Sequence, residues 1–172
     1  MDFQKEIFKK INLIDNFLRK EKIDFLICGG IAFSSLVYPR STVDIDLILN
    51  IKEKDLEALK NSFEKSIKNL VINKKIMKFG NVKVLRAIFI EKEKEFIIDL
   101  IFLNEEYLKE IFKNKIVVNF YNLKLPIVAP DDLFILKSLS EREKDKMDLE
   151  EIKKKYKINY NYVKKWLKKL KG

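Results

Sequence analysis

Residues 28–50 read CGGIAFSSLVYPRSTVDIDLILN, and the interpretation of the whole chain starts from this stretch. It opens with two glycines after a short apolar run and closes with Asp44 and Asp46 inside a second apolar run. Side chains two residues apart in a strand point to the same side, so both carboxylates are expected on one face of a buried strand. Two ionised carboxylates there repel each other and lose hydration. The pattern therefore predicts a cation beside them.

A third carboxylate lies in a later apolar run, FIIDLIFL, at Asp99. Charged residues are seldom buried without a partner, and two partners are compatible with the sequence. If strand 95–103 pairs beside strand 43–49, Asp99 completes a three-carboxylate site without histidine. Alternatively, a salt bridge to Arg86 on a neighbouring strand gives Asp99 a structural role.

The two glycines predict an anion site. A strand that ends in Gly29-Gly30 and turns into a helix presents backbone N–H groups and the positive end of the helix dipole. Two glycines are also common in ordinary turns, so the pair alone has little specificity. A divalent-metal site next to a phosphate-binding turn suits phosphoryl or nucleotidyl transfer.

Composition narrows the chemistry. The chain has 172 residues, 47% of them hydrophobic, which suffices for one domain with a core. It contains no histidine and a single cysteine, Cys28, so internal disulfides, cysteine-based zinc sites and histidine acid–base catalysis are excluded. The remaining metal ligands are carboxylates, which favour Mg²⁺ or Mn²⁺. With neither a membrane-spanning run nor a signal peptide, we expect a cytoplasmic protein and no membrane partner.

The formal net charge is +10, from 36 basic and 26 acidic residues. This excess favours a polyanionic partner, either a nucleotide or a nucleic acid, although a lysine excess is also typical of a biased genome. Arginine is rare here, and its planar fork grips phosphate in a way that lysine cannot. The four arginines are Arg19, Arg40, Arg86 and Arg142.

Hydrophobic periodicity predicts an α/β fold: a small mixed β-sheet flanked by helices, with a helical C-terminal third. No repeat or linker interrupts the chain, so we expect a single domain over 1–172, with 131–171 as its helical portion. Turns are expected at 79–81 and 91–94. The expected helices are 2–21, 31–38, 53–69, 105–113 and the 131–171 portion. The expected strands are 23–28, 43–49, 71–79, 82–90 and 95–103, with further apolar segments at 115–120 and 123–128.

Three motifs together resemble the signature of the polymerase-β-like nucleotidyltransferase superfamily: CGG at 28–30, DIDL at 44–47 and IDL at 98–100. The spelling RSTVDID at 40–46 and the segment 125–152 look most like the branch of abortive-infection toxin nucleotidyltransferases. The resemblance implies that Asp44, Asp46 and Asp99 are catalytic and bind two Mg²⁺ ions, or Mn²⁺. It also implies that Asp99 takes the proton of the acceptor hydroxyl.

The resemblance further implies which residues face the NTP triphosphate: Gly29, Gly30, Arg40, Thr42, Lys137 and Arg142. Many members carry serine at the second glycine, so here backbone N–H groups must suffice, or Ser34 or Ser35 must supply a hydroxyl. Lys137 is equally compatible with a solvated helix face. Pairing with acids on its own helix also explains Arg142.

The expected reaction transfers a nucleoside monophosphate from an NTP to a hydroxyl and releases pyrophosphate. An RNA end, most of all tRNA, is the first candidate acceptor, as in toxin-type relatives that have an antitoxin partner. A small hydroxyl compound is the second, as in relatives that adenylylate aminoglycosides. A non-catalytic nucleotide-binding module is the third, and the complete set of acids argues against it.

Overall fold

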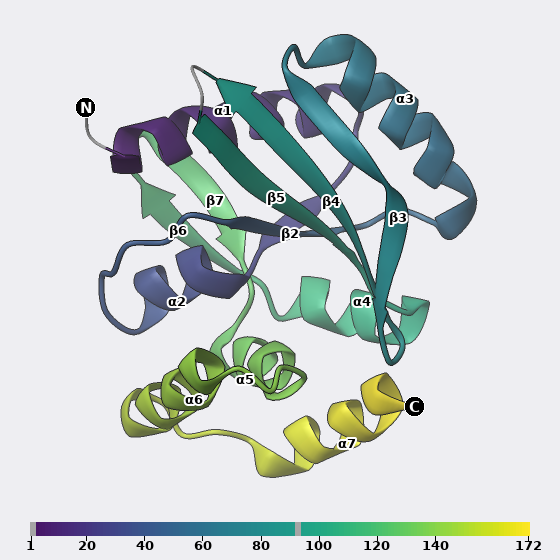
Figure 1. The fold of residues 1–172 in the computed structure, drawn as a ribbon. Coiled ribbons are helices and arrows are strands. Elements are labelled where there is room, and N and C mark those ends of the chain that lie inside the picture. Colours follow the sequence, from purple (N-terminus) through teal and green to yellow (C-terminus); the bar gives the residue numbers. More distant parts are fainter. Residues whose placement is uncertain (1–2, 92–93) are drawn as a thin grey trace.

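A seven-stranded mixed sheet runs through the computed structural model, which describes residues 3–91 and 94–172 (Figure 1). The strand order is β3-β4-β5-β2-β1-β7-β6. The β1–β7 and β2–β5 pairs are parallel and the other neighbours are antiparallel. The strands are β1 (Phe25–Ile27), β2 (Ile45–Leu49), β3 (Leu70–Phe79), β4 (Val82–Glu91), β5 (Lys94–Phe102), β6 (Ile116–Phe120) and β7 (Leu123–Ile127). The predicted α/β fold class is confirmed.

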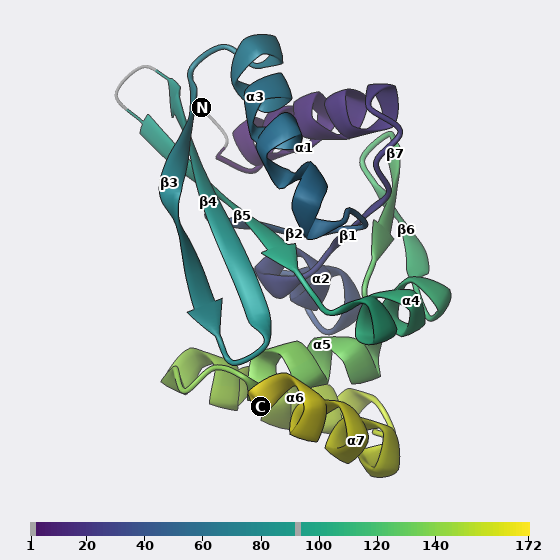
Figure 2. The same ribbon diagram turned by 90° about the vertical axis from the view of Figure 1, so that its right-hand side faces the viewer.

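Helices cover the sheet on both faces (Figures 1 and 2). On one face lie α1 and α3, which meet where the rings of Phe17 and Phe63 approach to 4.2 Å. On the other face lie α2 and, beyond it, a layer made by α5, α6 and α7. The helices are α1 (Phe3–Lys20), α2 (Gly29–Leu36), the 3₁₀ turn η1 (Glu53–Asp55), α3 (Leu56–Ser66), α4 (Glu105–Lys113), α5 (Pro130–Ser138), α6 (Glu143–Lys155) and α7 (Tyr160–Lys171). None of these helices, within the described ranges, is long and apolar enough to cross a membrane.

Two boundaries differ from the expectation in ways that affect the site. Strand β2 begins at Ile45, where its ladder with Ile98 of β5 starts, so Asp44 precedes the strand instead of lying in it. The C-terminal portion is helical but is divided into three helices, with breaks at 139–142 and 156–159. The expected start of the first helix at residue 2 and part of the expected turn at 91–94 lie outside the described residues.

The C-terminal helices are attached to the sheet layer by buried polar and aromatic contacts. Asp132 of α5 is fully buried and accepts hydrogen bonds from the hydroxyls of Tyr107 (2.9 Å) and Tyr162 (2.7 Å). The rings of Tyr107 and Trp166 lie 4.8 Å apart. At the far end of α7, the Asn81 N–H of the β3–β4 turn donates to the Leu170 carbonyl (2.9 Å). These contacts join α4, α5, α7 and the β3–β4 hairpin.

We therefore expect the chain to unfold as one cooperative unit. Trp166 is the only tryptophan of the sequence and lies buried in α7, so its fluorescence reports on the C-terminal helices. Far-ultraviolet circular dichroism reports on the whole chain. In a urea titration the two signals should give the same midpoint. A tryptophan transition at clearly lower urea would show that the C-terminal portion is a separate domain.

Candidate active site

Three charged residues form a row across neighbouring strands. Asp46 of β2 is the register partner of Asp99 of β5, and Asp99 is the partner of Arg86 of β4. Partners in adjacent strands project to the same face of a sheet, so the order across that face is Arg86, Asp99, Asp46. The strand of Asp99 therefore does pair beside the strand of Asp46, which the sequence left as a condition, and the pairing is parallel. It brings together two aspartates that lie 53 positions apart in the numbering.

The row lies on the wall of a cleft of about 1020 Å³ between the sheet and the C-terminal helices. Its polar lining contains the three aspartates, the two glycines, and the cations of α5 and the loop after it. The β3–β4 turn, the end of α7 and a set of apolar side chains also line it. All nine residues named above from the motifs line this cleft: Gly29, Gly30, Arg40, Thr42, Asp44, Asp46, Asp99, Lys137 and Arg142. The apolar side chains include Met77, Phe79, Val82, Val84, Ile101, Leu136, Leu139 and Leu170.

Asp46 is the most perturbed carboxyl group of the cleft. Burial, followed by the nearby charges of Asp99 and Asp44, raises its pKa to about 6. A hydrogen bond from the backbone N–H of Gly30 acts in the opposite direction. Gly29 has a φ of +60°, and a Cβ added there would lie 1.9 Å from the Asp46 Oδ2 atom. The first glycine is therefore required both by its backbone conformation and by the space that the Asp46 carboxylate occupies.

The second glycine is explained by Thr42. A Cβ added at Gly30 would lie 2.4 Å from the Thr42 Oγ1 atom, so the threonine hydroxyl stands over the first turn of α2. The serines that we considered as hydroxyl donors are used elsewhere: Ser34 donates to the Arg40 carbonyl (3.1 Å) and Ser35 to the Ile31 carbonyl (3.0 Å). The hydroxyl that faces the glycine turn belongs to Thr42.

Asp99 forms the salt bridge with Arg86 that the sequence offered as an alternative. Arg86 donates to both of its oxygens, from Nε to Oδ1 (2.8 Å) and from Nη2 to Oδ2 (2.8 Å). This hydrogen-bonded pair raises the pKa of Arg86. In residues 3–91 and 94–172, no three cysteine or carboxylate side chains form a complete metal site. Asp99 thus faces the cleft while it is bound to an arginine.

The cations expected at the triphosphate meet two aspartates of α6. Lys137 is buried and donates to Asp145 (2.9 Å), and it lies 2.5 Å from an oxygen of Asp148. Arg40 forms a two-pronged pair with Asp148, in which Nη2 lies 2.7 Å from Oδ2. Arg142 donates from Nε to Asp145 (2.7 Å), but its side chain remains 76% exposed. Of the three cations, Arg142 is therefore the most accessible from solvent.

Asp145 and Asp148 are residues that sequence reasoning missed. Both are 2% exposed, although they lie in the highly charged run EKDKMDLEE, which leads into the lysines at 153–155. Their spacing of three places them on one face of α6, and this spacing was the available signal. The many neighbouring lysines concealed it, because such a run is typical of a solvated helix.

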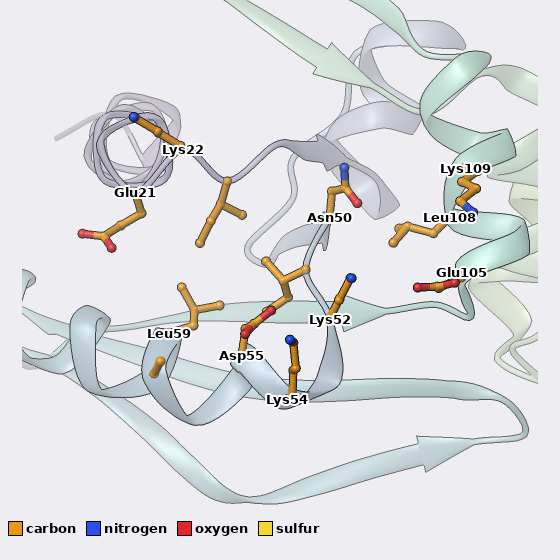
Figure 3. Close-up of a pocket in the computed structure, with 13 residues that line it drawn as sticks. Glu21, Lys22, Asn50, Lys52, Lys54, Asp55, Leu59, Glu105, Leu108 and Lys109 are labelled. Carbon is orange, nitrogen blue, oxygen red and sulfur yellow. The ribbon is translucent and has the colours of Figure 1, made fainter.

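A second cavity, of about 640 Å³, lies near the end of α1, the start of α3 and α4 (Figure 3). Lysines, carboxylates and a few apolar side chains line it, among them Lys22, Lys52, Asp55 and Glu105 (Figure 3). It contains none of the motif residues. The motif residues all line the larger cleft instead, which makes it the candidate active site.

Comparisons with solved structures identify the fold. The lincosamide antibiotic adenylyltransferase LnuA, solved with lincomycin bound, matches with a TM-score of 0.56 and 14% identity, over 86% of this chain and 97% of that one. The antibiotic-resistance factor ANT(2'')-Ia matches with a TM-score of 0.64 and 10% identity, over 96% and 91%. TM1012 from Thermotoga maritima matches with a TM-score of 0.56 and 14% identity, over 96% and 94%. At these identities the likeness shows a shared fold.

The sequence itself matches no curated protein. It does match a family model over residues 4–171, nearly its entire length, and that model is described as a nucleotidyltransferase of unknown function (DUF6036). The motifs, the β2–β5 pairing and the fold agree with this match. The predictions of the superfamily and of a nucleotidyltransferase enzyme are confirmed. The chain belongs to the DUF6036 family of nucleotidyltransferases.

Proposed function

We propose that the protein transfers a nucleoside monophosphate from an NTP to a hydroxyl acceptor, with Mg²⁺ as cofactor. One observation carries the proposal. Asp44, Asp46 and Asp99 line the same cleft as the glycine turn at the start of α2, although Asp99 arrives from a distant part of the chain. Carboxylates beside an anion-binding turn are the parts that nucleotidyl transfer requires.

The donor set of the cleft fits a hard divalent cation. Asp44, Asp46 and Asp99 offer carboxylate oxygens, which Mg²⁺ and Mn²⁺ prefer. The raised pKa of Asp46 shows that its negative charge is poorly compensated in the protein alone. We assign two ions to these aspartates. When bound, such ions neutralise phosphate charge and lower the pKa of an attacking hydroxyl.

Charge is distributed over the cleft in two clusters that complement the substrates. On the sheet, three aspartates face one arginine, which leaves a negative excess. Elsewhere in the cleft, Arg40, Lys137 and Arg142 face Asp145 and Asp148 of α6, which leaves a positive excess. The negative cluster suits the metal ions and the positive cluster suits the triphosphate.

Within the positive cluster the three cations have different tasks. Arg40 and Lys137 are held in place by the α6 aspartates and shape the site. Arg142 is mostly exposed and can turn towards a phosphate while it remains near Asp145. The backbone N–H groups at Gly29 and Gly30 and the Thr42 hydroxyl complete the proposed phosphate contacts. Asp99 is assigned as the acceptor of the hydroxyl proton.

Two acceptors have support. An RNA end, tRNA above all, is favoured by the net charge of +10. A cognate antitoxin belongs to this candidate only, and it rests on the resemblance to toxin-type enzymes. A small hydroxyl compound is favoured by the cleft, which must hold the NTP and the acceptor in about 1020 Å³ and has many apolar side chains in its lining. That space suits a small molecule or the terminal nucleotide of a single strand.

Replacing either Asp44 or Asp46 with asparagine should abolish Mg²⁺-dependent NTP turnover. We expect a loss of at least about a hundredfold, because the amide cannot hold the metal that activates the hydroxyl. Release of pyrophosphate measures the reaction. Asp55→Asn, an exposed carboxylate in the second cavity, is the matched control and should retain activity. Full turnover by Asp46→Asn would contradict the proposed site.

The same Asp46→Asn variant should be more stable than the parent at neutral pH. The folded-state pKa of Asp46 is about 6, above the ordinary 3.8, so its ionisation opposes folding at pH 7 and ceases to do so as the pH falls from about 6 towards 4. Without metal, we expect the variant to gain about 1–3 kcal/mol at pH 7, a gain that disappears near pH 4. Thermal melts with a chelator measure it. An inactive but stabilised variant shows that the loss of turnover is not a loss of folding.

Thr42 should bind phosphate through its hydroxyl. Thr42→Val keeps the shape and removes the hydroxyl, so we expect about tenfold weaker Mg-ATP binding, whereas Thr42→Ser should bind as the parent does. Gly30→Ser alone should bind Mg-ATP more weakly than the parent, because the added side chain clashes with Thr42. The double variant with Thr42→Gly should recover binding, because the serine hydroxyl then takes the vacated place. Unchanged affinity in Thr42→Val, measured by calorimetry, would remove Thr42 from the phosphate site.

The acceptor is tested with α-³²P-labelled NTPs, Mg²⁺ and either total RNA or a panel of hydroxyl compounds that includes lincomycin and tobramycin. Transfer to RNA should place label in a discrete band and should weaken steeply with salt. Transfer to a small molecule should give a labelled compound on thin-layer chromatography and should depend little on salt. Asp46→Asn serves as the inactive control in both arms.

A further inference from the structure

Arg86 contacts both carboxylate oxygens of Asp99, whereas a general electrostatic attraction would not require direct hydrogen bonds. The two residues are direct register partners on β4 and β5, and both oxygens of the carboxylate accept hydrogen bonds of 2.8 Å from the guanidinium. Such two-pronged pairs are strong and directional. The Asp99 side chain is 14% exposed and that of Arg86 is 36% exposed, so solvent screens the pair only in part.

This pair gives the protein a cation of its own at the carboxylate cluster. Asp99 lies beside Asp46, and the charges of both Asp99 and Asp44 disfavour ionisation of Asp46. Arg86 is the cation that directly contacts Asp99 and thereby offsets this repulsion. The same contact engages both Asp99 oxygens, and the described residues contain no complete three-ligand site.

We propose that Arg86 is a positioning residue that competes with the divalent cation for Asp99. It holds the third carboxylate in the protein without metal, and metal binding at the cluster must replace or share this contact. The inference rests on the proposed function, since it takes Asp44, Asp46 and Asp99 as the metal ligands.

The choice of arginine agrees with this role. A lysine offers one compact charge, whereas the guanidinium fork holds the carboxylate at two points and fixes its orientation. Only four arginines occur among 36 basic residues, and this one lies opposite the third carboxylate of the motif. At the same position, a lysine should hold Asp99 less firmly.

The test measures Mn²⁺ binding to the full chain without nucleotide, from the electron paramagnetic resonance signal of free Mn²⁺. Arg86→Met should bind Mn²⁺ about tenfold more tightly than the parent, since the competing cation is gone. Lys144→Met removes another positive charge from the same cleft and measures the general effect of charge. It should change the affinity by less than about twofold, because exposed charges are screened.

The tighter Mn²⁺ binding of Arg86→Met should depend on Asp99. In an Asp99→Asn background, Arg86→Met should bind Mn²⁺ no more tightly than Asp99→Asn alone. Arg86→Lys, which keeps the charge and is the milder change for folding, should bind Mn²⁺ with an affinity between those of the parent and Arg86→Met. Thermal melts give a second readout. Arg86→Met should melt lower than the parent without metal and should gain more from added Mg²⁺.

The inference is overturned if Arg86→Met binds Mn²⁺ no better than Lys144→Met, if it binds more weakly, or if the gain persists without Asp99. Failure of the proposed function has a different signature. In that case Asp46→Asn would bind Mn²⁺ as tightly as the parent, whatever the behaviour of the Arg86 variants.

Discussion

The parallel pairing of β2 with β5 is the constraint on which the site depends. It sets Asp46 beside Asp99 in the middle of the sheet, where the flanking strand residues Ile45, Leu47, Ile98 and Leu100 are apolar and buried. Adjacent carboxylates in such surroundings oppose folding unless positive charge or hydrogen bonds offset them. The chain supplies both: Arg86 pairs with Asp99, while Lys137 and the Gly30 N–H at the start of α2 favour the ionised form of Asp46. The sheet, the glycine turn and the charged row are therefore one arrangement.

The negative charge of these carboxylates is only partly compensated. The pKa of Asp46 remains raised despite its Gly30 hydrogen bond, so the protein retains unfavourable negative charge at the edge of an open cleft. A group selected for stability alone would be apolar or fully paired. Retained charge of this kind is typical of sites that bind a cation or carry out proton transfer. The residues that lower the stability of the sheet are therefore also the residues for which a functional interpretation is supported.

Across the cleft from the sheet the charges are reversed: buried aspartates of α6 pair with cations. Two buried aspartates of α6 pair with three cations; Arg40 and Lys137 are held inside the protein, whereas Arg142 is largely exposed. Preorganised charge needs little rearrangement when a polyanion binds. The Asn81–Leu170 hydrogen bond and the buried Asp132 fix the distance between the two clusters, because they attach these helices to the sheet layer.

The sequence by itself indicated the candidate residues for the chemistry and the elements that bear them. The apolar runs, the glycine turn and the DIDL motif predicted the mixed sheet and a shared site for Asp44, Asp46 and Asp99, because strand periodicity and glycine geometry are local properties. Only the tertiary structure decided the partner of each charge. Arg40 meets Asp148 across 108 positions, and Thr42, not Ser34 or Ser35, stands over Gly30. Such pairings depend on how distant elements pack, and a helix rich in lysines reveals nothing locally about which of its aspartates will be buried.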